Sequence, residues 1–171
     1  MGRGKVIQTL RFSSVLAPLT EAELRELANC GRICFYETSQ HIVTVDDRDD
    51  YMFVLRRGRV ALHITMLPAG GQCEGKATVE LTTPGEVFGW AAWLQPDGIS
   101  VTAYALEPCS VVRLNLDHLK DAQISWKVSW RMLQNLYGLL QERGLCPPNV
   151  QALLKLGQVA TLEWMPANGE G

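Results

Sequence analysis

The sequence predicts a mainly β domain with flanking helices: a β-roll, or double-stranded β-helix of the jelly-roll type, followed by a long C-terminal helix. Short runs of alternating apolar and polar residues recur between about residues 32 and 115. Turn signals separate these runs, a pattern typical of β-sandwiches and β-rolls. From about residue 116 the apolar residues fall at helical spacing instead. A chain of 171 residues favours one domain with a substantial hydrophobic core.

The composition is that of a folded globular protein, with 47% hydrophobic and 20% charged residues. The net charge is −2 and there is no basic block, which argues against a broad nucleic-acid surface because such a surface needs clustered Lys and Arg. No apolar run approaches the length of a membrane span, and no signal-peptide core follows the basic N-terminus. We therefore expect a cytoplasmic protein with no membrane span and no direct DNA binding.

The cysteines and histidines predict no metal or redox centre. The five cysteines are scattered and form no C-x-x-C pair, so we expect small buried side chains in a reducing compartment. The histidines lack the His-x-His spacing of a cupin-type metal site, which makes a jelly-roll metalloenzyme the least favoured class. We expect no cofactor and no enzymatic activity. These residues are Cys30, Cys34, Cys73, Cys109, Cys146, His41, His63 and His118.

The N-terminal part divides into two segments. Residues 1–14 show no clear period and are expected to form an extension or arm. Thr20 then begins a helix, with Glu23 three residues later as a capping box requires. The apolar stripe of this helix consists of Leu24, Leu27 and Ala28.

Seven β-strands are expected in the central part of the chain, separated by loops. An acidic loop is expected at 46–50 and a Gly-rich loop at 67–76. A hairpin turn at 56–59 places Gly58 where positive φ is needed. The expected strands are 32–37, 41–45, 51–55, 60–65, 78–82, 99–105 and 109–114.

The segment 84–105 has the order turn, short helix, loop and strand. Pro84 and Gly85 form a turn signal, and Gly89 lies where the chain must change direction. The apolar run 90–94 is long enough for one packed helical turn, and backbone N–H groups at the start of such a turn can hold an anion. In the strand that follows, one side carries Ile99, Val101, Ala103 and Ala105, and the other carries Ser100, Thr102 and Tyr104.

This segment resembles the phosphate-binding cassette of the cyclic nucleotide-binding domain family, which includes the Crp/Fnr-type regulators. The resemblance covers about residues 14–144, and a second match is the run from Val54 to Leu62. It implies a regulatory or sensory module in which a ligand contacts the cassette and shifts the C-terminal helix. The matching cassette residues are Gly85, Glu86, Phe88, Gly89, Ala91, Ala92, Ser100, Thr102 and Ala103.

Two residues depart from the family pattern, and both are ligand contacts in the family. Trp90 stands where the resemblance implies a Glu that holds the ribose hydroxyl, and Ile99 stands where it implies an Arg that pairs with the cyclic phosphate. Trp90 either forms an aromatic wall for a planar ligand or fills the pocket itself. A cation from elsewhere replaces the missing Arg only if folding brings one to the cassette. The candidate cations are Arg59, Lys76 and Arg113.

The candidate ligand-binding residues therefore belong to a degenerate cassette. Ser100 and Thr102 either donate hydrogen bonds to a ligand or form the polar face of a strand. We expect that cyclic AMP does not bind in the usual way; the alternative is a protein-interaction or scaffold module that kept the fold but lost the ligand. The candidate residues are Gly89, Trp90, Ala91, Ile99, Ser100 and Thr102.

The C-terminal helices, expected at about 116–144, carry two apolar stripes rather than one. A helix with two stripes is covered on two sides. The resemblance implies that this long helix packs on its own β-roll and on a second subunit, which predicts a homodimer. The tail 145–171 is too short for a winged helix-turn-helix. The stripes are Ile124, Val128, Met132, Leu136 and Leu139, and Trp126, Trp130, Leu133, Tyr137 and Leu140.

Overall fold

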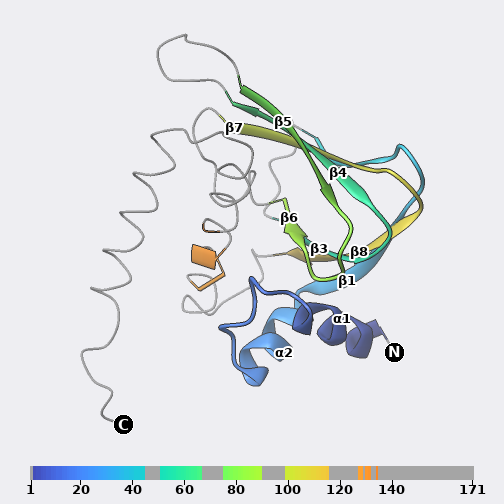
Figure 1. The fold of residues 1–171 in the computed structure, drawn as a ribbon. Coiled ribbons are helices and arrows are strands. Elements are labelled where there is room, and N and C mark those ends of the chain that lie inside the picture. Colours follow the sequence, from blue (N-terminus) through green and yellow to red (C-terminus); the bar gives the residue numbers. More distant parts are fainter. Residues whose placement is uncertain are drawn as a thin grey trace.

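The computed structural model describes residues 2–44, 51–66, 75–89 and 99–115, together with residues 127, 128, 130, 131 and 134. Two helices precede a succession of strands in this part of the chain (Figure 1). The helices are α1 (Gly2–Arg11) and α2 (Glu21–Asn29). The strands are β1 (Gly31–Tyr36), β2 (His41–Val43), β3 (Tyr51–Arg57), β4 (Val60–Met66), β5 (Gly75–Leu81), β6 (Val87–Phe88), β7 (Ile99–Ala105) and β8 (Cys109–Asn115).

The strands form two four-stranded antiparallel sheets, and the helices add a third layer. The sheet in the order β1-β8-β3-β6 is called sheet A here, and the sheet in the order β2-β7-β4-β5 is called sheet B. Helices α1 and α2 lie on the side of sheet A that faces away from sheet B (Figure 1). This arrangement confirms the prediction of a mainly β architecture with flanking helices and places the core between the two sheets.

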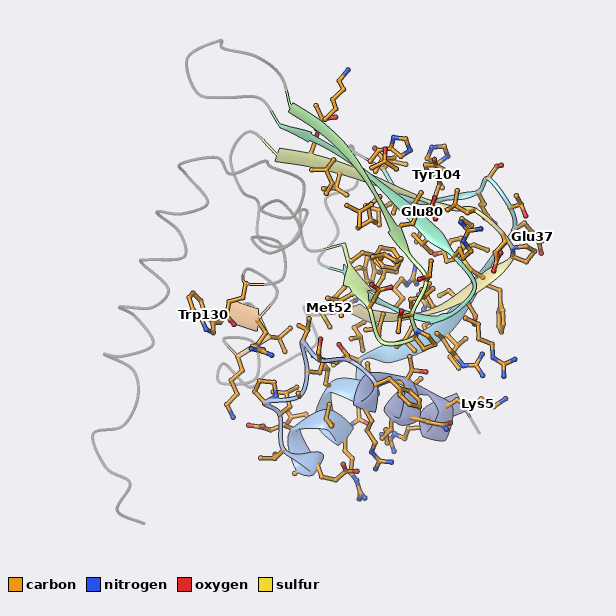
Figure 2. The ribbon with its side chains drawn as sticks, in the orientation of Figure 1. Lys5, Glu37, Met52, Glu80, Tyr104 and Trp130 are labelled. Carbon is orange, nitrogen blue, oxygen red and sulfur yellow. The ribbon has the colours of Figure 1, made fainter. Side chains whose placement is uncertain are left out.

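Sheet B alternates as the sequence predicts, with one buried face. Val101, Ala103 and Ala105 on β7 are buried, whereas Tyr104 between them is not. On β4, Val60, Leu62 and Ile64 are buried and His63 is exposed. Figure 2 shows Tyr104 on the outer side of this sheet, away from Met52 in sheet A. The inward face of sheet B therefore packs on the core and its outward face meets solvent.

The strands β3 and β8 of sheet A are buried on both faces. On β3, four successive residues from Met52 to Leu55 are buried, and so are residues 109–112 on β8. The helices cover one face at Gly31, where an added Cβ would lie 2.8 Å from the Leu114 side chain and 3.1 Å from Val6 of α1. Leu114 therefore faces the helices, and the alternate residues of β8 face sheet B.

Residues 2–11 are helical and packed, which corrects the prediction of an N-terminal arm. Val6 and Leu10 lie one turn apart on α1 and are buried against the rest of the domain, and Leu10 is fully buried. The sequence pattern was misleading because two buried apolar positions in a short segment with two glycines make a weak helical period.

The second helix agrees with its sequence signals. The Thr20 side chain accepts a hydrogen bond from the Glu23 N–H, and the Glu23 carboxylate accepts one from the Thr20 N–H at 2.7 Å, so the capping box is confirmed. Leu24, Leu27 and Ala28 are the buried residues of α2, as predicted.

Several boundaries differ from the sequence prediction. Strand β3 runs on to Arg57, β2 ends at Val43, and β5 begins at Gly75 within the expected Gly-rich loop. Gly58 has φ +93°, which confirms the positive φ expected in the hairpin turn. Among the cysteines, Cys109 is buried as expected, but Cys30 and Cys34 are only half-buried. Burial raises the pKa of all three thiols.

The predicted C-terminal helix lies mostly outside the described residues. Lys127, Val128, Trp130, Arg131 and Gln134 are helical, and Val128 is buried. Lys127 Nζ lies 2.8 Å from Glu23 Oε1 of α2, and Arg131 Nη2 donates to the Ser14 carbonyl at 3.1 Å. These contacts join Lys127 and Arg131 of the predicted C-terminal helix to the segment around α2. The remainder of 116–144 and the tail 145–171 lie outside the described residues, as do the acidic loop 46–50 and residues 67–74.

Candidate functional site

A turn held by hydrogen bonds opens the candidate cassette. Gly85 has φ +97° and its N–H donates to the Leu55 carbonyl at 2.8 Å, which ties the turn to β3. The Glu86 carboxylate accepts hydrogen bonds from the N–H groups of Thr82 and Thr83 at 2.8 and 2.9 Å. Glu86 is therefore used by the turn itself, as a carboxylate that satisfies two backbone donors.

Among the candidate residues before the loop, Gly89 is the one that lies within the described part of the chain. It has φ +86°, and an added Cβ would lie 2.8 Å from the Phe53 ring and 3.0 Å from the Tyr51 carbonyl. A side chain at this position would meet both backbone strain and a collision. The requirement for glycine at the change of direction, predicted from the sequence, has this physical cause. Trp90 and Ala91 follow it and lie outside the described residues.

Strand β7 carries the other candidate residues. Ile99 opens the strand opposite Met66, Ser100 lies opposite Thr65, and Thr102 lies opposite His63. Ser100 and Thr102 are half-buried and alternate with the buried Val101 and Ala103. They therefore lie on the outward face of sheet B. The side chain of Ile99 lies outside the described set.

The three alternative cations take different positions. Arg59 Nη2 pairs with Glu80 Oε2 at 2.6 Å, and the Arg59 carbonyl accepts from Leu106 just beyond the C-terminal end of β7. Lys76 lies opposite Thr65 and is exposed. Arg113 lies in β8 opposite Phe53, and its guanidinium carbon is 4.6 Å from the centre of the Tyr51 ring. Of the three, Arg113 is the one on the face of sheet A that looks toward sheet B.

The fold also brings together residues that sequence reasoning treated as isolated. His63 Nε2 and the Tyr104 hydroxyl are 2.7 Å apart, and their ring centres are 4.9 Å apart. His41 lies opposite Tyr104 in the β2–β7 pairing, with ring centres 6.2 Å apart. The three side chains form an exposed row across β2, β7 and β4. Only the strand pairing, which the sequence does not state, would have revealed it.

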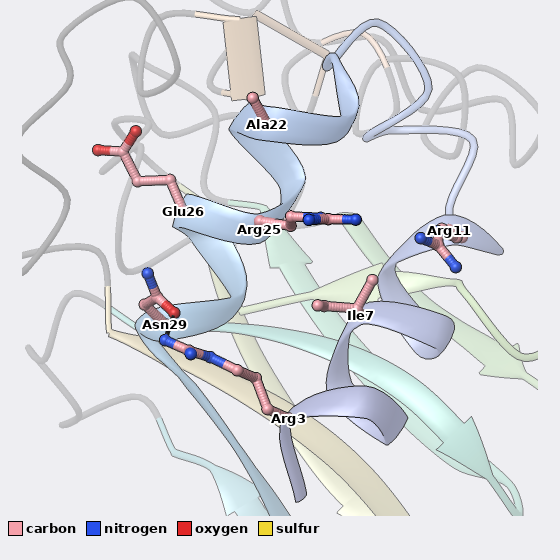
Figure 3. A pocket seen from close by; sticks show the side chains of 7 residues that line it. All are labelled: Arg3, Ile7, Arg11, Ala22, Arg25, Glu26 and Asn29. Atoms are coloured by element: carbon pink, nitrogen blue, oxygen red, sulfur yellow. Dashed lines mark hydrogen bonds between the residues drawn. The ribbon is translucent and has the colours of Figure 1, made fainter.

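A separate groove lies between α1 and α2 (Figure 3). It has a volume of about 470 Å³ and its walls carry three arginines. Arg11 pairs with Glu21, Arg25 Nε lies 3.5 Å from the same carboxylate, and Arg3 donates to Asn29. Because protein groups already engage these guanidinium groups, the groove is a weak candidate for an anion site. Its lining consists of Arg3, Ile7, Arg11, Ala22, Arg25, Glu26 and Asn29.

Two further searches concern the same described part of the chain. No group of three or more His, Cys, Asp or Glu side chains within it is placed to hold a metal ion. No helix within it is long and apolar enough to cross a bilayer.

The chain belongs to the cyclic nucleotide-binding domain family, because the model of that family matches residues 33–123, more than half of the sequence. This confirms the resemblance stated from the cassette residues. No curated protein matches the sequence.

Solved structures with the same fold come from kinase regulatory subunits and from transcriptional regulators. The regulatory domain of Toxoplasma gondii PKA, co-crystallised with cAMP, matches with TM-score 0.61 and 17% identity, over 78% of this chain and 49% of that one. The regulatory subunit of a cAMP-independent protein kinase A from Trypanosoma cruzi, bound to guanosine, matches with TM-score 0.60 and 19% identity, over 91% and 51%.

The sensor domain of the transcriptional regulator DNR from Pseudomonas aeruginosa matches with TM-score 0.56 and 20% identity, over 82% of this chain and 92% of that one. This chain thus spans about half the length of the two kinase structures and most of the length of the sensor domain. At these identities the likeness shows the fold.

Proposed function

We propose that this chain is a regulatory sensor module that does not bind cyclic AMP in the usual way of its family. The observation that carries the proposal is the loss of both charged ligand contacts, with Trp90 in place of the Glu and Ile99 in place of the Arg. The elements on either side of them are regular, since Gly89 has a positive φ and β7 pairs with β4 along its whole length.

The magnitude of the change at Ile99 supports this reading. Each charge-assisted hydrogen bond from a guanidinium to a phosphate contributes on the order of 1.5–3 kcal/mol. An isoleucine offers none of these bonds, and a buried phosphate would also lack its counter-charge. A loss of roughly 3–4 kcal/mol weakens a micromolar ligand to about millimolar affinity. Cyclic AMP is therefore a poor ligand unless another cation reaches the phosphate.

One of the similar structures is consistent with a ligand other than a cyclic nucleotide. The Trypanosoma cruzi subunit is described as cAMP-independent and is bound to guanosine, which carries no phosphate. It shares the fold at 19% identity, so the fold is compatible with a ligand that needs no phosphate-binding Arg. For this chain the same substitutions favour a ligand that is not held through a phosphate at the start of β7, or a pocket closed by Trp90.

The output of the sensor is proposed to be the C-terminal helix. Lys127 pairs with Glu23 of α2 and Arg131 donates to the Ser14 carbonyl, so a displacement of this helix would break an ion pair and a hydrogen bond. In the proposed homodimer the same helix meets its copy. Changing Leu136 and Leu139 to Asp should leave a folded monomer by light scattering, whereas a surviving dimer would contradict this interface.

The test is calorimetric titration with cyclic AMP, cyclic GMP and guanosine. We expect no cyclic nucleotide binding below about millimolar for the natural chain. The double variant Trp90→Glu, Ile99→Arg should gain binding by restoring the two charges. Thr78→Arg is the control for the added arginine alone, because it places a guanidinium on sheet B at an exposed position away from the start of β7.

Micromolar binding of cyclic AMP by the natural chain would overturn the proposal. Binding of guanosine but not of cyclic AMP would support an open pocket with a different ligand. An interaction module without a ligand is the second candidate, favoured by two large exposed aromatic side chains, Phe12 and Phe35, at 64% and 74% exposure. The absence of binding to all three compounds, in the double variant as well as in the natural chain, would favour it.

A further inference from the structure

Arg113 is a positively charged side chain on the core-facing side of sheet A. Its neighbours in β8, Val112 and Leu114, face the helices, as their approach to Gly31 and Val6 shows. Arg113 alternates with them and shares its face with Phe53, its partner in β3. Arg113 is half-buried, and an acceptor would stabilise its guanidinium because withdrawing an unpaired charge from water is costly.

Within the described part of the chain, the Arg113 guanidinium has no acidic partner. Its Nε is buried and makes no hydrogen bond, and its contact is with the face of the Tyr51 ring at 4.6 Å. Buried N–H groups are nearly always hydrogen-bonded in proteins, so an acceptor placed at this Nε would be stabilising. The ring supports the cation from one side and leaves the N–H edge of the guanidinium for an acceptor.

A second arginine stands directly opposite. Arg32 of β1 pairs with Arg113 across the strands, so both side chains lie on one face of sheet A. Like charges in directly opposed positions of a sheet repel each other and are destabilising. An anion bound between them would offset this repulsion and satisfy the Arg113 Nε. Arg32 is exposed, so this position is open to solvent.

The same place adjoins the candidate cassette. Phe53 lies between Arg113 on one side and Phe88 on the other, and the Phe53 and Phe88 rings stack at 5.1 Å. An added Cβ at Gly89 would touch the Phe53 ring and the Tyr51 carbonyl. Arg113, Tyr51 and Gly89 are therefore connected through β3. In the sheet, β3 separates β8, which carries Arg113, from β6, which leads into the cassette.

We propose that Arg113, supported by Tyr51 and Arg32, forms an anion-binding subsite beside the cassette that takes the phosphate or carboxylate group of a small organic ligand. This subsite rests on the proposed function, since it supplies a cation on sheet A in place of the Arg missing from position 99. It assigns the ligand a class, an organic anion with its charged group held by sheet A rather than by the start of β7.

The test uses the full chain labelled with ¹⁵N, with inorganic phosphate and acetate as probes and chloride at equal ionic strength as the reference. The Arg113 Nε–Hε resonance, identified by its loss in Arg113→Lys, should shift and saturate with phosphate, with acetate or with both. Arg113→Met should weaken the dissociation constant at least tenfold, read from the thermal stabilisation by the probe. Arg59→Met is the matched control, because Arg59 is an exposed arginine paired with Glu80.

The two probes distinguish the ligand classes. Saturation with phosphate alone assigns a phosphorylated ligand, and saturation with acetate assigns a carboxylate. No shift of the Arg113 resonance with either probe overturns the subsite, and so does an Arg113→Met variant that responds like the natural chain. If Arg113→Met fails to fold, the resonance in the natural chain still decides. Cyclic AMP binding is measured separately on the natural chain and on the double variant Trp90→Glu, Ile99→Arg, so failure of the subsite and failure of the proposed function remain distinct.

Discussion

Sheet A and sheet B have four strands each but are buried differently. Sheet B packs one face on the core and presents the other to solvent, with Thr78, Glu80 and His63 exposed. Sheet A lies between sheet B and the helices, so Met52 and Leu114 on its outer face are as buried as Leu55 on its inner face. The difference shows that the N-terminal helices are part of the core of the domain.

The largest expected effect concerns the covered face of sheet A. Leu114→Ala removes a fully buried side chain between β8 and α1 and should lower the free energy of unfolding by about 2–5 kcal/mol. Thr78→Ala, at an exposed position of sheet B, should lower it by less than about 1 kcal/mol. Urea unfolding of both variants measures the contrast, and equal losses would contradict the two-sided burial of sheet A.

A smaller effect is expected where α1 meets sheet A. Gly31→Ala places a methyl group 2.8 Å from Leu114 and 3.1 Å from Val6, and such overpacking costs about 1–3 kcal/mol. Gly4→Ala is the control on α1, because no atom lies within 4 Å of its added Cβ. That variant should be neutral or stabilising by up to about 1 kcal/mol through helix propensity. A Gly31→Ala variant as stable as the natural chain would mean that α1 does not press on this strand.

The same contrast explains how much could be predicted from the sequence. In sheet B the alternation of β4 and β7 identified the strands and their buried sides, because one face is polar. In sheet A the run from Met52 to Leu55 is apolar throughout, so the sequence indicated a strand but not which face carries the helices. Because the apolar residues of α1 show only a weak helical period, the sequence did not reveal the helical layer that covers sheet A.

The sequence predicted those features of the turns and the candidate site that depend on the backbone conformation of a single residue. Gly58, Gly85 and Gly89 were expected at turns, and all three have positive φ. The positions of Arg113 and of the His63–Tyr104 pair depend on the pairing of strands far apart in sequence. Alternation alone does not state which strands become neighbours, so neither was visible without the fold.

A modest effect is expected at the contact between the helix layer and the C-terminal helix. The pKa of Glu23 is held below its usual range, first by the Lys127 ammonium and then by the Thr20 N–H, against the opposing effect of burial. A lowered folded pKa means that the stabilisation is complete above the pKa of an unfolded glutamate, about 4.3, and is lost as pH falls through the folded pKa.

Glu23→Gln keeps a capping side chain but removes the charge, so it should lower stability by about 0.5–1 kcal/mol at neutral pH. Its difference from the natural chain should shrink on acidification below about pH 4. Thermal unfolding across that range measures both. A difference that stays constant with pH would mean that the Lys127 contact does not form in solution.

The smallest effect is expected on the open face of sheet B. The His63–Tyr104 hydrogen bond of 2.7 Å is exposed, so water can replace either partner, and His63→Ala should lower stability by only about 0.5 kcal/mol. Tyr104→Phe is the matched variant, because it removes the hydroxyl and keeps the ring. A loss for His63→Ala that approaches the loss for Leu114→Ala would show that this face is covered in solution by a second copy of the chain or by part of the chain beyond the described residues. In that case the contrast between the two sheets would disappear, and the row of His41, Tyr104 and His63 would be a buried contact rather than a solvated surface.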